Sequence, residues 1–241
     1  MIGPEHYTQL ISLLFSKLPM PTDPEQLLQK AVQLFSARKF KEAFKSSEQA
    51  RALFQKAGNR DRAMEALRVM ADSALNSRDT SQAAKLYQDL NKEGASVSSG
   101  FYQSAAQWGT GQIALRKMDY ASAAGSFKMG LDLSKKTGDK WYTAWNALGL
   151  ATAYRGMGKT TDAHGLLQGA ASDFRSIGQS NYAAWAEKAL SEIGGTVLQQ
   201  SPRDSKPWLC PMCGSSFPPA QAESLKKGSL VTCEYCGTSV G

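Results

Sequence analysis

Apolar and small residues recur at helical spacing along most of the chain. Over about residues 24–194 they return every three or four positions, with charged or polar residues between them. This periodicity is that of amphipathic helices, which bury one stripe and expose the opposite face. It predicts helices in pairs, each pair joined by a short turn. The pairs are expected over 25–37 and 41–56, 63–76 and 81–93, 102–117 and 121–137, and 141–155 and 161–177.

A repeated alanine sets the register of these pairs. It returns at every fortieth position, in the second helix of each pair, as Ala43, Ala83, Ala123 and Ala163. The first helix carries a small residue twelve positions earlier, namely Ala31, Ala71, Gly111 and Ala151. One pair of helices cannot bury its apolar face alone, so successive pairs must stack on one another. The expected fold class is therefore an all-α solenoid of four helical hairpins.

The turns follow the same repeat. The residues between successive pairs are Gly58, Ser98, Gly138 and Gly178. Glycine is common at this place because a helix often ends on a residue in the left-handed conformation. Three aspartates precede expected helices and can cap their first turns, namely Asp23, Asp79 and Asp119.

Each end of the repeat region has a segment that should close it. Residues 1–23 contain an apolar stripe over about 6–18, which predicts an N-terminal helix that caps the first pair. Docking of this helix elsewhere is the alternative. Residues 180–194 match the first helix of a fifth pair and should cover the last apolar face. The solenoid is thus expected over 24–194, followed by a polar linker over 195–206.

The last part of the chain carries all four cysteines. They are Cys210, Cys213, Cys233 and Cys236, in the spacing C-x2-C-x19-C-x2-C. Two such pairs are typical of a zinc site, because each short spacing places two thiolates on one tight turn. Four thiolates fill a tetrahedral shell, so we expect one structural zinc ion. Residues 207–241 resemble a zinc ribbon, with free thiols or a redox pair as the alternative.

The helical pairs resemble tetratricopeptide repeats. That family keeps a fixed order of small, aromatic and large residues. The third pair follows it with Gly111, Ala114, Ala123, Phe127 and Gly130, and the fourth with Ala151, Tyr154, Ala163, Leu167 and Ala170. The family's usual repeat is shorter, about 34 residues. The resemblance implies a concave surface, lined by the first helix of each pair, that binds other proteins.

Mapping the family's concave positions onto this chain gives a set of candidate partner-binding residues. They are Arg68, Asp72, Asn76, Trp108, Gln112, Arg116, Trp145, Arg155, Trp185 and Lys188. Tryptophan and arginine are common at binding hot spots, and arginine can grip a carboxylate with two hydrogen bonds. We therefore expect a protein or peptide partner, an acidic segment being one candidate. Packing between repeats is the alternative for Trp108 and Trp145.

Composition and charge are those of a folded protein without a dominant basic surface. Hydrophobic residues make up 42% of the chain, charged residues 20%, and the formal net charge is +7. The N-terminus lacks the basic and apolar regions of a secretory signal, and no apolar run could span a membrane. These features predict a cytoplasmic protein without membrane insertion. A non-catalytic adaptor or scaffold is the expected function, and a nucleic-acid-associated factor in transcription or translation is the alternative.

No group of residues predicts catalysis. Residues 153–160 resemble a phosphate-binding loop, with Lys159 and Thr160 as its last two residues, but a helix and not a strand precedes them. Their place in the repeat is the turn of the fourth pair. The two histidines, His6 and His164, belong to different regions and form no recognisable catalytic set.

Overall fold

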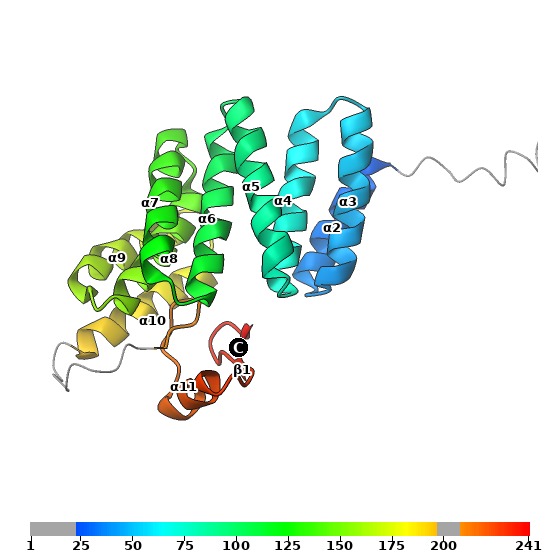
Figure 1. Ribbon diagram of the computed structural model, residues 1–241. Helices are drawn as coiled ribbons and strands as arrows, with labels where there is room; N and C mark the ends of the chain where they lie inside the picture. The colour runs from blue at the N-terminus through cyan, green and yellow to red at the C-terminus, as the bar shows by residue number, and fades with distance from the viewer. Residues whose placement is uncertain (1–22, 197–207) are drawn as a thin grey trace, which may run out of the picture.

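A computed structural model describes residues 23–196 and 208–241 of the chain. The expected N-terminal helix and nearly all of the expected linker lie outside these residues. The repeat region consists of α2 (Pro24–Ser36), α3 (Phe40–Lys56), α4 (Arg60–Asn76), α5 (Thr80–Ser96), α6 (Gly100–Arg116), α7 (Tyr120–Thr137), α8 (Lys140–Gly156), α9 (Thr160–Ser176) and α10 (Ser180–Thr196). Figure 1 shows them as a curved row of antiparallel helices.

The helices stack in two layers. Each helix packs on the next one along the chain, and the even-numbered helices from α2 to α8 also pack on one another. The even-numbered helices therefore form the inner layer, and α3, α5, α7 and α9 cover it from outside. The final helix, α10, packs on α9. This arrangement confirms the predicted all-α solenoid of four hairpins and a closing helix. Among the described residues, no helix combines the length and apolar character that a membrane span needs.

The repeated small residues lie at the contacts between helices. All four alanines of the second helices are fully buried, namely Ala43, Ala83, Ala123 and Ala163. Glycine allows the closest approach in the third and fourth pairs. A Cβ atom on Gly111 would lie 2.7 Å from the ring of Phe127, and Gly149 approaches the same ring from α8. The Phe127 ring is thus held between two inner helices.

Every turn between successive helices from α2 to α10, and not only those between pairs, contains a residue with positive φ. These residues are Arg38, Gly58, Arg78, Ser98, Met118, Gly138, Gly158 and Gly178. The amide of the residue after each positive-φ residue donates to the carbonyl five positions earlier. Asp119 N–H, for example, donates to Ala114 O at 3.0 Å. This is the hydrogen bond of a Schellman turn. The structural unit is therefore one helix with its turn, and two units make one sequence repeat.

Met118→Gly is expected to stabilise the protein by about 1 kcal/mol, because a non-glycine residue in the left-handed region is strained. Met118 has φ 55°, and about half of the residue is exposed, at 46%. The matched control is Met157→Gly, since Met157 also follows an inner helix but has φ −87°. The control should lower stability by about 0.5–1 kcal/mol. Urea unfolding measures both, and equal effects would contradict the role of φ.

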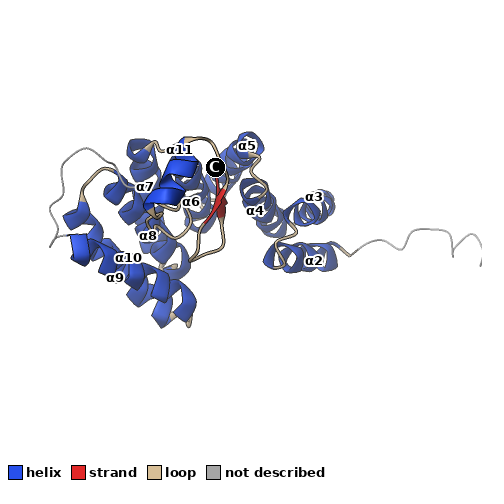
Figure 2. Ribbon diagram, turned by 90° about the horizontal axis from the view of Figure 1, so that it is seen from below, coloured by secondary structure: helices blue, strands red, loops and turns tan. Residues whose placement is uncertain are grey.

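The cysteine-rich C-terminal segment forms a small module of its own local structure. It contains α11 (Pro219–Lys226) and two short antiparallel strands, β1 (Val231–Thr232) and β2 (Ser239–Val240), with Val231 opposite Val240. In both overall views the module lies beside the ends of α6 and α8 (Figures 1 and 2). It is therefore placed against the solenoid and not away from it.

Candidate functional site

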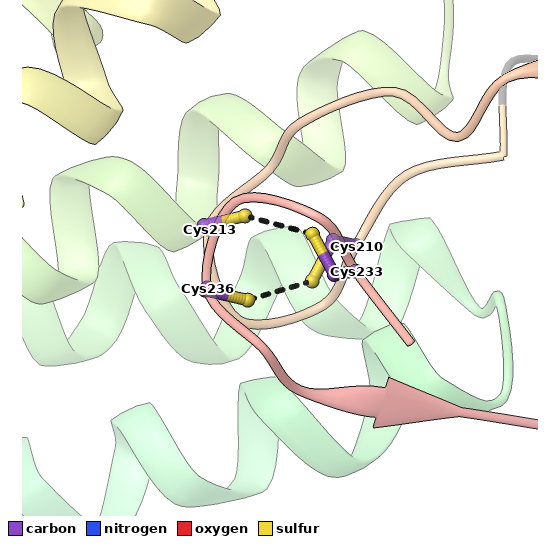
Figure 3. Close-up of side chains that lie close together, drawn as sticks. All are labelled: Cys210, Cys213, Cys233 and Cys236. Atoms are coloured by element: carbon purple, nitrogen blue, oxygen red, sulfur yellow. Dashed lines mark hydrogen bonds between the residues drawn. The ribbon is translucent and has the colours of Figure 1, made fainter. Parts of the chain in front are cut away.

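The four cysteines meet at one point of the C-terminal module. Their Sγ atoms all lie within 4.8 Å of one another. The Cys210 and Cys236 sulfurs are 3.5 Å apart, and the Cys213 and Cys233 sulfurs are 3.7 Å apart (Figure 3). Both distances are too long for a disulfide bond and every thiol is free. The sequence-predicted ligand set is thus brought together.

The cluster has the dimensions of a metal site. A tetrahedron with metal–sulfur bonds of about 2.3 Å has sulfur–sulfur edges of about 3.8 Å, close to the two distances observed. Hydrogen bonds among the thiols shift their pKa values in opposite directions, lowering that of Cys236 and raising that of Cys210. The four residues could therefore hold one metal ion.

The tight turns of the cysteine pairs depend on glycine. Gly214 and Gly237 follow the two pairs, with φ of 72° and 66°. At Gly214 a Cβ atom would lie 2.5 Å from the hydroxyl oxygen of Thr152 on α8. The first turn thus approaches the solenoid more closely than any larger residue would permit.

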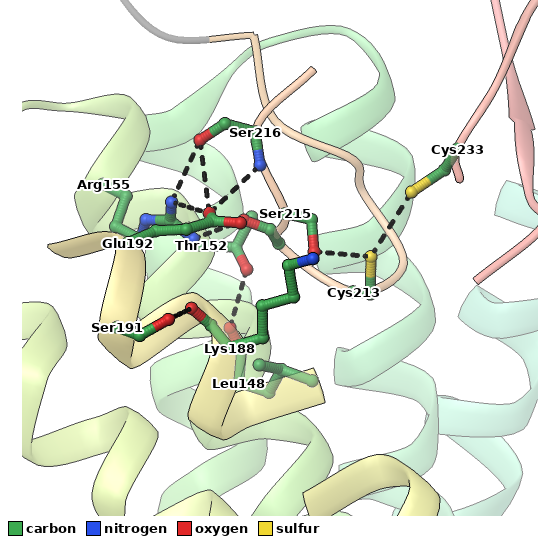
Figure 4. A network of polar contacts seen from close by, with 11 residues as sticks. Leu148, Thr152, Arg155, Lys188, Ser191, Glu192, Cys213, Ser215, Ser216 and Cys233 are labelled. Atoms are coloured by element: carbon green, nitrogen blue, oxygen red, sulfur yellow. Dashed lines mark hydrogen bonds and ion pairs between the residues drawn. The ribbon is translucent and has the colours of Figure 1, made fainter. Parts of the chain in front are cut away.

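Two arginines of the solenoid hold these two turns. Arg155 of α8 donates to the carbonyl of Gly214 and to the hydroxyl of Ser216, the latter at 3.1 Å. The same guanidinium pairs with Glu192 of α10 at 2.8 Å (Figure 4). Only 6% of Arg155 is exposed. From the other end of the solenoid, Arg38 donates to the carbonyl of Gly237 at 2.9 Å.

A third contact comes from α10. The Lys188 ammonium lies 3.1 Å from the ring centroid of Tyr235, which is between the second pair of cysteines. Trp185 of the same helix packs against the hydrophobic cluster around the cysteines. The module therefore spans the inner face from the α2–α3 turn to α10.

A cavity of about 440 Å³ lies between the inner helices and the module. Six of the ten predicted partner-binding residues line it, namely Arg68, Asp72, Asn76, Trp108, Trp145 and Trp185. The other residues that line the cavity were not predicted as partner-binding residues. They include Phe35, Arg38, Phe40, Trp141, Tyr142, Tyr182, Met212, Cys236 and Thr238. The cavity thus combines both parts of the chain in one site.

Aromatic rings form one side of the cavity. The ring of Trp145 lies edge-to-face with those of Trp141 at 5.8 Å and Tyr182 at 5.0 Å between centroids. Trp108 is 8% exposed and Trp145 6%, so both pack between repeats as the alternative expected. Both also line the cavity, so one role does not exclude the other.

The polar side of the cavity is an ion-pair network. Arg68 binds Asp72 at 2.7 Å and Glu65 at 2.6 Å, and Tyr87 donates to the second oxygen of Asp72 at 2.6 Å. Burial raises the pKa of the Asp72 carboxyl, while the charge of Arg68 opposes that shift. Asn76 donates to the backbone oxygen of Asp72. These groups are already bonded to one another.

The four remaining predicted residues lie outside this cavity. Gln112 is 1% exposed and lies in the core. Arg116 donates to the carbonyl of Leu75 and lines a second cavity, of about 380 Å³, beside Trp208 of the module. Arg155 and Lys188 are held by the module, as described above.

Some of the cavity residues that were not predicted could have been found from the sequence. Trp141 stands one helical turn before Trp145, and Tyr182 stands one turn before Trp185. The aromatic stripe thus continues along the same helix faces. The module residues that line the cavity had no such signal in the sequence, because their position depends on how the module packs against the solenoid. Residues 153–160, which resemble a phosphate-binding loop, form the end of α8, the turn after it and the start of α9, as expected, and the Lys159 ammonium lies 5.8 Å from the centroid of the Tyr154 ring.

A comparison of the chain with models of protein families gives no match, and a comparison with curated proteins gives none either. The functional argument therefore rests on the geometry of the cysteine cluster and of the inner face.

Proposed function

We propose that the chain is a non-catalytic adaptor that binds a segment of a partner protein on the inner face of its solenoid. In this proposal the helical pairs are tetratricopeptide-type repeats, and the C-terminal module is a zinc ribbon. The stacking of paired helices with small residues at their contacts supports the first assignment. The four converging sulfurs support the second.

Zinc is the metal that best suits the cluster. Four thiolates in a tetrahedral arrangement favour zinc, or iron in sulfur clusters, over metals that prefer oxygen ligands. A bound zinc ion would neutralise part of the thiolate charge and fix the two turns. Cys210, Cys213, Cys233 and Cys236 would fill its shell and leave no position for a substrate, so we assign it a structural role.

The observation that carries the binding proposal is the cavity between the solenoid and the module. Ligand sites are concave and mostly apolar, with a few polar groups that converge on them. This cavity has tryptophan and tyrosine walls, and Arg68, Asp72 and Asn76 form its polar side. Tryptophan is the residue most enriched at binding hot spots. The module would act as the second contact for the partner.

The nucleic-acid alternative has less support from the contacts. Binding to a phosphate backbone needs available lysine and arginine side chains. On the inner face, Arg38, Arg68 and Arg155 already donate to carbonyl or carboxylate oxygens of the chain itself. A salt-dependent shift of bulk RNA or DNA by the protein would favour this alternative instead.

The test of the binding proposal is selection from a displayed library of random peptides against the full chain. Enriched peptides should lose at least tenfold in affinity for Trp141→Ala, because Trp141 is a half-buried wall of the cavity. Met129→Ala is the control, since Met129 is exposed on α7 of the outer layer. Failure to enrich any peptide, or equal binding by both variants, would refute an inner-face site.

A further inference from the structure

We infer that the inner-face cavity takes a cationic side chain, an alkylammonium group such as that of lysine or methylated lysine, from the partner segment. The inference rests on the proposed function, because it names the chemistry of a ligand at the same site. The expected ligand is thus positively charged, whereas the arginines in the sequence suggested an acidic partner segment. Three features of the cavity carry it.

The first feature is the aromatic wall. Trp141, Tyr182 and Trp185 are half-buried in the cluster around the cavity, and Trp108 and Trp145 complete the wall behind them. Faces of tryptophan and tyrosine rings attract a cation through their quadrupole, and several rings around one ammonium group form an aromatic cage. The chain itself shows this contact at the border of the module, where Lys188 lies over Tyr235.

The second feature is the sign of the charge beside the wall. Arg68 is bound by two carboxylates, those of Glu65 and Asp72. One guanidinium against two carboxylates leaves this network negative, and the guanidinium of Arg38, which also lines the cavity, balances that charge. Cys236 lines the same cavity, and four thiolates around a divalent metal also leave a net negative charge. The charge of the thiolate cluster therefore decides the sign, and it favours a cationic ligand.

The third feature is that the arginines of the cavity already donate hydrogen bonds to groups of the chain itself. Arg68 directs Nε, Nη1 and Nη2 to carboxylate oxygens. Arg38 holds the carbonyl of Gly237. An acidic ligand at Arg68 would have to displace the carboxylates of Glu65 or Asp72, and that displacement would offset the gain from its own ion pairs. A cationic ligand leaves them in place.

The test uses the full chain with its metal and two small probes, choline and neohexyl alcohol. The second probe replaces the quaternary nitrogen of choline by carbon, so the pair differs in charge at nearly equal shape. Four of the five tryptophans line the cavity, so intrinsic fluorescence reports binding there. Choline should change the emission saturably, with at least about tenfold higher affinity than the neutral probe. Equal affinities, or no saturable change with choline, would overturn the inference.

Two variants locate the site. Trp141→Phe should weaken choline binding several-fold, because tryptophan is the strongest ring for a cation. Trp208→Phe is the matched control, since Trp208 lines the second cavity and not this one. Equal loss in both variants would overturn the placement. The wild-type comparison of the two probes needs no variant and stands if either substitution disturbs folding.

A peptide arm separates this inference from the proposed function. Short peptides that differ only in trimethyllysine or norleucine at one position are titrated into the same protein. Preference for trimethyllysine supports the inference. Binding without preference, still lost in Trp141→Ala, keeps the inner face as a peptide site and overturns the cationic assignment. Absence of binding by either peptide, together with failure of the library selection, refutes both.

Discussion

Loss of the metal is expected to unfold the C-terminal module and leave the helical repeats folded. Residues 208–241 contain one short helix and two strands of two residues each, too little to form a self-sufficient core. In the proposed zinc ribbon, metal binding would therefore supply most of the folding free energy of the module, on the order of 10 kcal/mol. The nine helices α2–α10 have their own buried core and do not depend on the metal in this way.

Metal analysis should find about one zinc ion per chain, because four thiolates make one closed site. Chelation, or Cys213→Ser, should leave the far-ultraviolet circular dichroism nearly unchanged while the module becomes sensitive to protease. Trp185 packs against the cysteine cluster, so its emission should shift as well. Leu230→Ser is the control, because Leu230 is an exposed residue of the same module. Retention of a protease-resistant module without metal would contradict the prediction.

Arg155→Met is expected to release the module from the solenoid and to cost about 3 kcal/mol. The guanidinium is buried and joins Glu192 of α10 to the Gly214 carbonyl and the Ser216 hydroxyl. Removal of one member of such a buried network is strongly destabilising, because polar groups that were paired lose a donor they cannot replace. Arg155→Lys should restore only part of the loss, since an ammonium group cannot reproduce the planar fork of arginine.

The matched control for this prediction is Arg175→Met. Arg175 pairs with Glu187, but their side chains are 60% and 42% exposed. Exposed ion pairs contribute about 0–1 kcal/mol. Urea unfolding followed by tryptophan fluorescence measures both variants, and protease sensitivity of the module reports its release. If Arg155→Met costs no more than Arg175→Met, the contact with Gly214 does not hold the module.

The periodic parts of the structure could be predicted from the sequence, because their causes are local. The spacing of apolar residues determines the helices, and the buried alanines such as Ala123 mark where two helices meet. The convergence of the four cysteines could be predicted for a similar reason, since each pair lies on one turn. The left-handed turn at Met118 was missed because its residue is not glycine.

The inner face could not be predicted in the same way, because it depends on contacts between distant residues. Arg155 and Gly214 are 59 positions apart, and Arg38 and Gly237 are 199 apart. No local pattern encodes such a pairing. The resemblance to tetratricopeptide repeats pointed to the helices that line the cavity, but it gave no information about the module that lies against them. Arg155 and Lys188 therefore looked available for a partner, although both bind the module.

The contact between Arg38 and Gly237 has a consequence for how the chain unfolds. In a solenoid whose repeats contact only their neighbours, the end repeats can unfold separately and the whole array can bend along its length. Here the α2–α3 turn touches the module, and the module touches α8 and α10. The two ends of the solenoid are therefore connected through the cysteine-rich module. The folded module thereby links the first and last helices of the row, and this link should restrain the curvature of the solenoid in addition to the contacts between repeats.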